Sequence, residues 1–254
     1  KLALKYAEIA KKAFLKELDI EIEIKKITTE GDLILDRRTS EIGGKGEFIK
    51  NIEKELISKN IDVAVHSLKD VPSIKTKGLS MECFLKRNDP QEVLINKENL
   101  TLDKIKKNSV IGTSSLRREF QLKHLRPDLK FKLIRGNIDT RIKKLDEDQY
   151  DSIILAKAGL LSLSIENRIS EVFECEKIVP PAGQGTIVIQ SREDDDKLNS
   201  ILSKINHFET SIEAKQTESI EQSAEPKAAE EQIKKEASEQ SLHEEKKEDV
   251  KIYG

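Results

Sequence analysis

Five arginines occur between Val110 and Leu161, close to short apolar runs. Most of them fall in two segments, GTSSLRR at 112–118 and RGNIDTR at 135–141. Each segment begins near the end of a predicted buried strand, and open parallel sheets bind ligands beyond the carboxyl ends of their strands. A guanidinium group binds a carboxylate or phosphate through two parallel hydrogen bonds. We therefore expect a site for a ligand with several negative groups, lined by Arg117, Arg118, Arg135 and Arg141, with Arg126 further out.

Hydroxyl side chains precede the first arginine pair, where a helix is predicted to begin. Thr113, Ser114 and Ser115 would offer hydroxyl and amide donors there, and the positive end of the helix dipole also favours an anion. The alternative is ordinary helix capping beside two solvated arginines. The second segment repeats the arrangement with Asn137 as the candidate cap. Two such segments after neighbouring strands are harder to explain by capping alone.

A pentapeptide with both an acid and a base, HSLKD at 66–70, follows another predicted strand. Alone, such a segment is most often a surface ion pair of little energetic value. If it faces the arginines, Asp70 becomes the one buried carboxylate of a positive site. It would stay ionised and could stabilise a cation that develops in a substrate. GGKG at 43–46 lacks the spacing and the following hydroxyl residue of an ATP-binding loop, so that interpretation is rejected.

The elements that must position these residues alternate between strands and helices. Helices are predicted over most of 2–18 and 48–60, and strands at 20–24, 61–65, 109–111, 131–134, 152–156 and 186–190. The 61–65 strand is expected to be parallel because its β-branched residues indicate burial on both faces. This order predicts an α/β protein of two lobes with a ligand cleft between them. One lobe would comprise 1–86 and 187–207, and the other 91–184.

Charge is unevenly distributed along the chain. Residues 209–254 hold 13 acidic and 7 basic residues, so this stretch carries −6 and the remainder +4. A mildly basic body suits an acidic small molecule and is too weak to indicate nucleic acid. Residues 208–254 are expected to be an acidic low-complexity tail, disordered or loosely helical.

The few cysteines and histidines limit which metal or disulfide chemistry is expected and indicate the redox compartment. Cys83 and Cys175 are isolated from each other and from the four histidines, which predicts neither a metal site nor a disulfide framework. Unpaired cysteines favour a reducing compartment, and we expect a cytoplasmic protein. No apolar run approaches the length of a membrane span, so no membrane association is expected.

Several segments together resemble the porphobilinogen deaminase family, also called hydroxymethylbilane synthase, of tetrapyrrole and haem biosynthesis. The resemblance covers roughly residues 1–207. A single segment would be modest support, whereas the ordered set is highly specific. In chain order the matching segments are LALKYA, TEGD, IGGKGEFIKNIEKEL, IDVAVHSLKDVP, GTSSLRREFQL, RGNIDTRIKKLD, YDSIILAKAGL and PAGQG.

The resemblance implies a fold and a reaction. The fold would be two lobes like those of type II periplasmic binding proteins, together with a small third domain, in a monomer. The reaction would condense four porphobilinogen units, with loss of ammonia, into hydroxymethylbilane. Each unit carries an acetate and a propionate; once ammonia leaves, the electrophilic azafulvene is attacked by the free α-carbon of the growing oligopyrrole.

The resemblance also implies roles for individual residues. Asp70 would be catalytic, holding pyrrole N–H groups and stabilising positive charge on the rings. The family builds a dipyrromethane cofactor from substrate and joins it to a cysteine by a thioether. Substrate and cofactor carboxylates would be bound by Lys69, Thr113, Ser115, Arg117, Arg118, Arg135 and Arg141. Further substrate or cofactor contacts would come from Asp32, Lys45 and Phe48.

The chain departs from the family pattern in four places. Ser162 stands where an arginine is expected, and the family's arginine-and-serine pair would lie before Lys1. No glycine-rich cysteine loop follows His207, so no cysteine is assigned to cofactor attachment, and the acidic tail replaces the third domain. The main hypothesis is a porphobilinogen deaminase. The alternatives are a decayed homologue that at most binds carboxylates between its lobes, and a solute-binding protein of similar fold.

Overall fold

The computed structural model describes residues 1–27, 49–72 and 75–216. Lys1–Ile212 forms one compact unit, and residues 213–216 are the described part of the chain that follows it. Residues 208–216, the described part of the expected acidic tail, are helical. No helix in the described ranges is long and apolar enough to cross a membrane. The predicted α/β class is confirmed.

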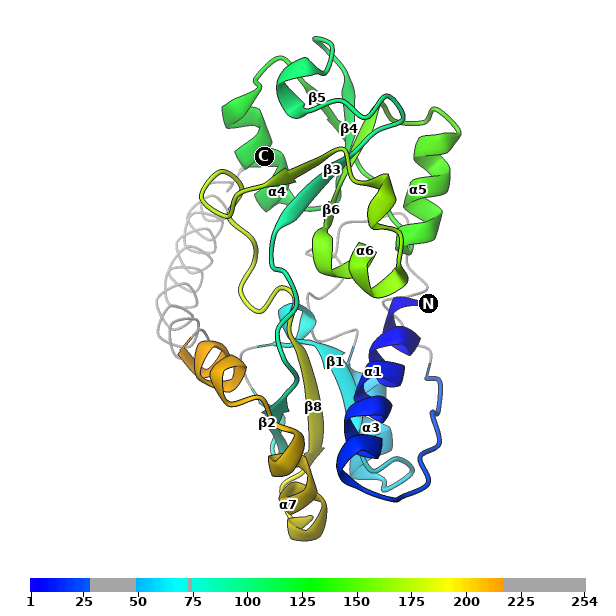
Figure 1. Ribbon diagram of the computed structural model, residues 1–254, viewed down its shortest axis with the longest axis vertical. Helices are drawn as coiled ribbons and strands as arrows, with labels where there is room; N and C mark the ends of the chain where they lie inside the picture. Colours follow the sequence, from blue (N-terminus) through cyan, green and yellow to red (C-terminus); the bar gives the residue numbers. More distant parts are fainter. Residues whose placement is uncertain (28–48, 73–74, 217–254) are drawn as a thin grey trace, which may run out of the picture. The chain divides into compact units, whose positions relative to one another are not determined.

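Among the described residues, a first sheet has three strands in the order β1-β8-β2, formed by Ala64–Ser67, Ile187–Arg192 and Leu79–Phe84 (Figure 1). Strand β8 is central and pairs antiparallel with both neighbours. The strand predicted at 61–65 thus forms as β1, three residues later. Among the described residues, the neighbour of β1 is β8, and the two strands run antiparallel. The prediction of a parallel pairing is wrong for this neighbour, because burial on both faces does not fix strand direction. Its register places Ala64 opposite Gln190.

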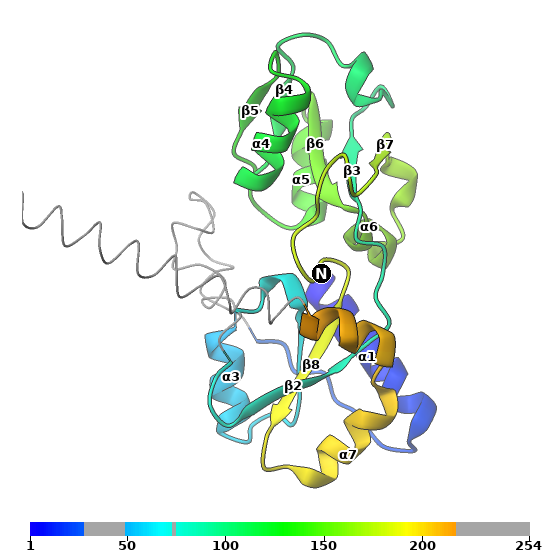
Figure 2. The ribbon, with the colours of Figure 1, turned by 90° about the vertical axis from the view of Figure 1, so that its left-hand side faces the viewer.

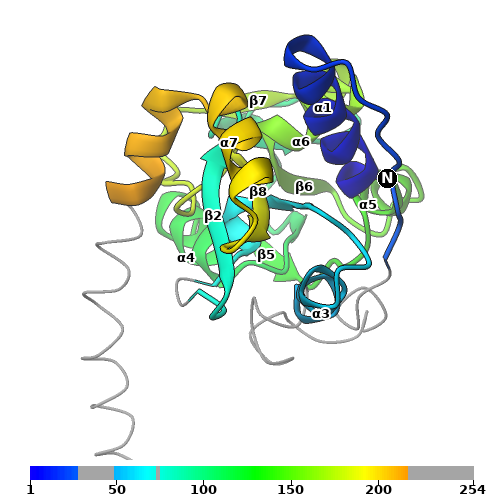
Figure 3. The same ribbon diagram turned by 90° about the horizontal axis from the view of Figure 1, so that it is seen from below.

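The described helices around this first sheet are α1 (Leu2–Glu17), α3 (Lys50–Ile57) and α7 (Asp196–Ile205) (Figure 3). Alternate residues of β8 face opposite sides. Ile187 and Ile189 pack with Phe14 of α1 and Leu202 of α7. Leu56 of α3 belongs to a separate cluster with β1 and β2. The sheet is therefore covered on both faces, so a functional site is expected at its edges or in its loops.

The strand predicted at 20–24 does not form, so that prediction was wrong. Residues 18–27 have no regular secondary structure. Ile22 packs against the cluster of α1, and its backbone oxygen accepts a hydrogen bond from the Lys11 side chain. Alternating apolar residues allow an extended chain, but a strand also needs a neighbouring strand for its backbone hydrogen bonds.

A second sheet has five strands in the order β5-β4-β6-β3-β7 (Figure 1). The neighbours β5, β4 and β6 run parallel, whereas β3 is antiparallel to both β6 and β7. The helices that flank this sheet are α4 (Leu116–Leu125), α5 (Ile138–Asp146) and α6 (Lys157–Leu163). Figure 2 shows the sheet from another side. The strands span Lys130–Lys132, Val110–Gly112, Ser152–Ala156, Glu92–Ile95 and Glu171–Phe173.

Both faces of the second sheet are packed. Ile153 and its alternate neighbours join a cluster with α5 and α6, whereas Ile154 faces Leu122 of α4 and Phe173 of β7. Full burial of such side chains stabilises a fold by about 1.5–3 kcal/mol each. The parallel strands β4, β5 and β6 therefore end at one rigid edge, from which α4 and the segments leading to α5 and α6 begin.

Candidate functional site

The start of α4 is held by the hydroxyl residues that the sequence singled out. Ser115 is the N-cap, and its side chain accepts a hydrogen bond from the backbone N–H of Arg118 at 3.4 Å. Thr113 is buried, and its Oγ1 accepts from the backbone N–H of Ser115 at 3.2 Å. The capping interpretation is therefore realised. Each hydroxyl still has its own O–H to donate, so capping and anion binding are compatible.

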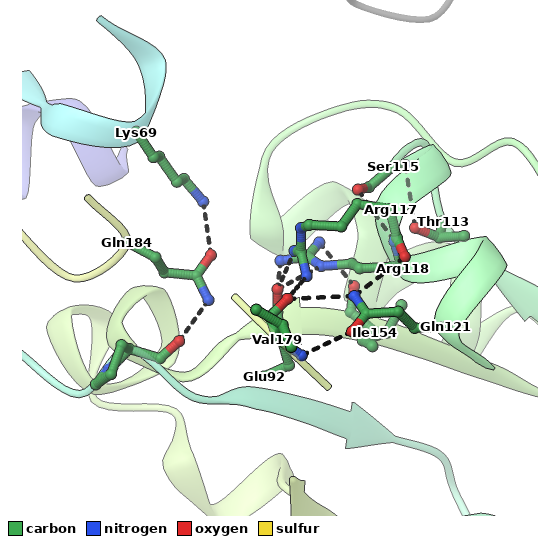
Figure 4. A network of polar contacts seen from close by, with 11 residues as sticks. Lys69, Glu92, Thr113, Ser115, Arg117, Arg118, Gln121, Ile154, Val179 and Gln184 are labelled. Atoms are coloured by element: carbon green, nitrogen blue, oxygen red, sulfur yellow. Dashed lines mark hydrogen bonds and ion pairs between the residues drawn. The ribbon is translucent and has the colours of Figure 1, made fainter. Parts of the chain in front are cut away.

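Arg117 and Arg118 converge on one carboxylate, that of Glu92 at the start of β3 (Figure 4). Arg118 donates from Nε and Nη2 to the two carboxylate oxygens at 3.0 and 2.7 Å. Arg117 donates from Nη2 to Oε1 of Glu92 and from Nη1 to the backbone oxygen of Val179. Both arginines lie where the sequence predicted, but each already binds an internal anion.

Glu92 is the main functional candidate that sequence reasoning missed. It is 0% exposed, and burial opposes its ionisation, but the charges and hydrogen bonds of Arg118 and Arg117 outweigh burial and lower its pKa. A signal existed in QEVLI at 91–95, where an acid opens an apolar strand. Buried acids are rare unless paired, so this pattern calls for a cationic partner.

The second arginine segment lies after β5. Asn137 is the N-cap of α5 by position, but its side chain makes no capping hydrogen bond. Arg135 is buried, and Arg141 donates from Nε to the backbone oxygen of Gly136 at 2.7 Å. Burial, followed by the charges of Arg118 and Arg135, lowers the pKa of Arg141 to about 10. The structure thus brings three guanidinium groups of two separate segments within electrostatic reach of one another.

Lys69 and Asp70 lie on a short 3-10 helix, Leu68–Asp70, directly after β1. Burial lowers the pKa of Lys69; the Asp70 charge raises it and the Arg118 charge lowers it further. Asp70 also raises the pKa of Arg141. Residues that follow strands of both sheets therefore interact with each other. Asp70 itself is exposed, so the expectation of a buried carboxylate was wrong.

Gln184, in the glycine-rich turn at 180–185, connects Lys69 to the segment that leads into β3. Its Oε1 accepts from Nζ of Lys69 at 3.5 Å, and its Nε2 donates to the backbone oxygen of Pro90 at 2.6 Å (Figure 4). Its backbone oxygen accepts from Nε of Arg87 at 3.1 Å. The sequence indicated the turn but not this fully buried side chain.

Other predicted or discussed residues lie outside this cluster. Arg126 binds Asp128 and the backbone around Leu102, as its more remote position in the sequence suggested. Ser162 is buried and donates to the backbone oxygen of Ala158 at 2.8 Å. Burial and the charge of Asp70 raise the pKa of Tyr6 to about 12, although a hydrogen bond with Ser162 lowers it. Asp32, Lys45 and Phe48 lie outside the described residues.

The two thiols are poorly suited to react. Cys83 is buried in the first sheet, and burial raises its pKa to about 12. Burial and neighbouring acids also raise the pKa of Cys175. A thiol reacts as its thiolate, so both shifts reduce nucleophilicity at neutral pH. In the described ranges, no three His, Cys, Asp or Glu side chains are grouped to hold a metal ion.

The arrangement suits a ligand with several carboxylates. Among the described residues it combines five cationic side chains with only two acids, Glu92 and Asp70. An anion placed there would relieve the repulsion between the cations and would gain charge-assisted hydrogen bonds. The cations are Lys69, Arg117, Arg118, Arg135 and Arg141.

Comparison with protein families gives a match over residues 1–200, to the family model described as porphobilinogen deaminase, dipyrromethane cofactor binding domain. Curated relatives carry the name porphobilinogen deaminase. The relative from Oceanobacillus iheyensis is 48% identical over 197 residues, which is 77% of this chain and 63% of that protein. The relative from Staphylococcus saprophyticus is 46% identical over 196 residues, covering 76% of this chain and 64% of that protein. The chain thus spans less than two thirds of the length of these relatives.

The solved structures that the chain matches are more distant in sequence. A putative methionine-binding lipoprotein from Bacillus subtilis is 14% identical, with a TM-score of 0.48 over 81% of this chain and 87% of that one. An ancestral cationic amino acid solute-binding protein is 15% identical, with a TM-score of 0.48 over 85% of this chain and 83% of that one.

Proposed function

The chain belongs to the porphobilinogen deaminase family, and we propose that it binds porphobilinogen and the growing oligopyrrole for the stepwise condensation that yields hydroxymethylbilane. We further propose that the two sheets mark two lobes, 1–86 with 187–207 and 91–184, and that the ligand lies between them. Residues that follow strands of both sheets, Lys69 and Arg118, interact electrostatically, which supports this placement.

The observation that carries the proposal is the cluster of cations at the strand ends. Burial and two neighbouring arginines lower the pKa of Arg141 to about 10, so its charge is costly without an anion nearby. Porphobilinogen carries two carboxylates, and each added pyrrole brings two more. The resident acids Glu92 and Asp70 cannot balance the five cations, whereas a polycarboxylate ligand can.

Asp70 is assigned the catalytic role because it is the exposed carboxylate beside these cations. In the reaction, the C–N bond of the aminomethyl group breaks and ammonia leaves. The free pyrrole α-carbon of the acceptor then forms a C–C bond to the exocyclic carbon and loses its proton. Positive charge develops on the pyrrole rings in both stages, and a carboxylate placed at the ring N–H groups lowers the energy of that charge.

The family's dipyrromethane group fits this chain in part. Its carboxylates match the hydroxyl and guanidinium donors of Thr113, Ser115 and Arg141, which lie at the starts of α4 and α5. When bound, dipyrromethane supplies the pyrrole end to which the first substrate unit adds. Neither thiol fits the covalent link, since Cys83 is buried and the pKa values of both thiols are raised. We therefore assign carboxylate binding to this chain and no attachment residue.

The decayed homologue remains as an alternative because of Ser162. Its hydroxyl is committed to the backbone of Ala158 and to Tyr6, so this position offers no charge to a carboxylate. Such a protein would bind porphobilinogen without releasing ammonia.

Calorimetric titration with porphobilinogen, together with an assay of released ammonia, tests the proposal. We expect binding by the unaltered chain and a loss of about tenfold or more in Arg141→Gln, because a charged hydrogen bond contributes about 1.5–3 kcal/mol. Arg168→Gln is the matched control, since Arg168 pairs with Asp146 at 2.6 Å on the surface of the same region. Ammonia release would support the enzyme, and binding without it would favour the alternative.

Asp70→Asn separates catalysis from binding. The substitution removes the charge but keeps the shape, so it should abolish ammonia release while porphobilinogen still binds. If the unaltered chain does not bind porphobilinogen, the proposed binding is refuted. If Asp70→Asn keeps full turnover, the catalytic role of Asp70 is refuted.

A further inference from the structure

Glu92 is a buried carboxylate for which neither the fold nor the proposed reaction gives an obvious need. It is the first residue of β3, paired with Ala156 of β6 and Phe173 of β7, and is 0% exposed. A buried ion pair is a weak source of stability, since well-packed apolar residues in its place are often as stabilising or more so. Its position between two arginines of the site therefore points to a role in the site.

The geometry explains what the carboxylate does. Arg117 and Arg118 are consecutive on α4, and consecutive helical residues point about 100° apart because a turn takes 3.6 residues. Their guanidinium groups nevertheless meet at Glu92 Oε1, which accepts from both, while Oε2 accepts from Arg118 alone (Figure 4). Two like charges held this close require a counter-charge, and Glu92 provides it at a fixed point of the sheet.

The two arginines are left with different capacities. Arg118 uses three of its nitrogens, two toward Glu92 and Nη1 toward the backbone oxygen of Ile154 at 3.3 Å, and its side chain is 9% exposed. Within the described residues, Arg117 uses its two terminal nitrogens, toward Glu92 and Val179, and its side chain is 28% exposed. A guanidinium has five N–H groups, so Arg117 keeps more of them for a ligand.

We propose that Glu92 is a positioning residue that anchors Arg118 in the interior and turns Arg117 toward a carboxylate of the ligand. This inference rests on the proposed function for the identity of the ligand. It assigns unequal roles to two adjacent arginines: Arg117 contacts the ligand, and Arg118 is a fixed support.

The test compares Glu92→Gln and Glu92→Asp with the unaltered protein in calorimetric titrations with porphobilinogen. Positioning predicts about tenfold weaker binding for Glu92→Gln and partial recovery for Glu92→Asp, which keeps the carboxylate. Simple electrostatics predicts the opposite change in affinity for Glu92→Gln, because removing a negative charge from a cationic site strengthens anion binding. Asp146→Asn, which removes the carboxylate partner of Arg168 on the surface, is the matched control and should leave affinity unchanged. Equal or tighter binding by folded Glu92→Gln would overturn the proposal.

A second readout needs no ligand and is measured on the unaltered protein. In NMR spectra of the Arg side chains, the Nε–H of Arg118 in the unaltered protein should exchange slowly with water, since Glu92 accepts it in the interior. Arg118→Lys identifies the resonance. Rapid exchange of this N–H would show that Glu92 does not hold Arg118 and would overturn the proposal. Slow exchange in a protein that does not bind porphobilinogen would support the anchoring by Glu92 and refute only the proposed function.

Discussion

The ammonium group of Lys69 lies 3.5 Å from the side-chain oxygen of Gln184, and the amide nitrogen of Gln184 lies 2.6 Å from the backbone oxygen of Pro90. One buried amide therefore joins a cation that follows β1 to the segment that precedes β3. The oxygen end of an amide accepts and the nitrogen end donates, so this side chain can bridge a cation and a carbonyl without a charge of its own.

Replacing Gln184 should disturb both stability and the site. Gln184→Ala leaves the half-buried carbonyl of Pro90 without its donor, which should lower the free energy of unfolding by about 0.5–1.5 kcal/mol. It should also weaken porphobilinogen binding severalfold, because Lys69 loses its acceptor. Chemical denaturation and calorimetry measure the two effects. Gln149→Ala is the control, since Gln149 is exposed and bonds only at the surface. Equal stabilities of the two variants would contradict the bridging role.

The turn that carries Gln184 should tolerate no side chain at Gly185. Its φ of +85° disfavours other residues, and an added Cβ would lie 2.4 Å from the backbone oxygen of Asn88. Gly78 has the same φ but open space around it, which makes Gly78→Ala a matched control for conformational strain alone. Gly185→Ala should therefore cost about 1–3 kcal/mol more than Gly78→Ala in denaturation experiments. Similar losses would show that the contact with Asn88 is easily relieved.

His66 should make the protein less stable in mild acid. Its Nε2 lies 3.0 Å from Oε1 of the buried Gln190, whose Nε2 donates to Glu53 at 2.8 Å. Burial lowers the pKa of His66 below 6.5, although Gln190, Glu53 and Asp70 oppose the shift. Below pH 6.5 the unfolded chain therefore binds a proton more readily than the folded one, and stability falls as pH falls.

Denaturation between pH 7 and pH 5 tests this histidine. His66→Gln should reduce the slope of unfolding free energy against pH, whereas His124→Gln, at an exposed position, should not. An unchanged slope in His66→Gln would rule out this residue as the source of the acid sensitivity.

Glu92 should also make the stability depend on pH, but in a more acidic range than His66 does. Its pKa is lowered below 4.5 in the folded protein, so its contribution is complete above pH 4.5 and is lost as pH falls through the folded-state value. At pH 7, Glu92→Gln leaves the buried charge of Arg118 without its partner and should cost about 3 kcal/mol. The difference from the unaltered protein should narrow below pH 4.5. A constant difference at all pH values would indicate a packing effect only.

The local features of the site could be predicted from sequence. Ser115 was recognised as a helix start because a hydroxyl residue followed by helix formers has few other uses there. Arg117, Arg118 and Arg135 were placed after strand ends because short apolar runs indicate buried strands, and β4, β5 and β6 form close to the predicted positions. The α/β class followed from the same alternation of elements.

Pairing between distant segments was decided only by the tertiary structure. Alternating isoleucines at 20–24 allowed a strand, yet none forms, and the partner of β1 runs antiparallel. Such outcomes depend on which backbone groups find partners across the chain, and periodicity carries no information on that. The neighbouring residues in the sequence likewise did not predict that Asp70 is exposed.

The sequence by itself determined the family, the α/β class and the cationic character of the strand-end loops, because these depend on residue types and their order. Only the tertiary structure revealed that Glu92 binds both arginines of α4 and that Gln184 binds Lys69. These partners are 25, 26 and 115 residues apart, and only folding brings their side chains within hydrogen-bonding distance. Which cations face a ligand and which support the fold is therefore a property of the packed molecule.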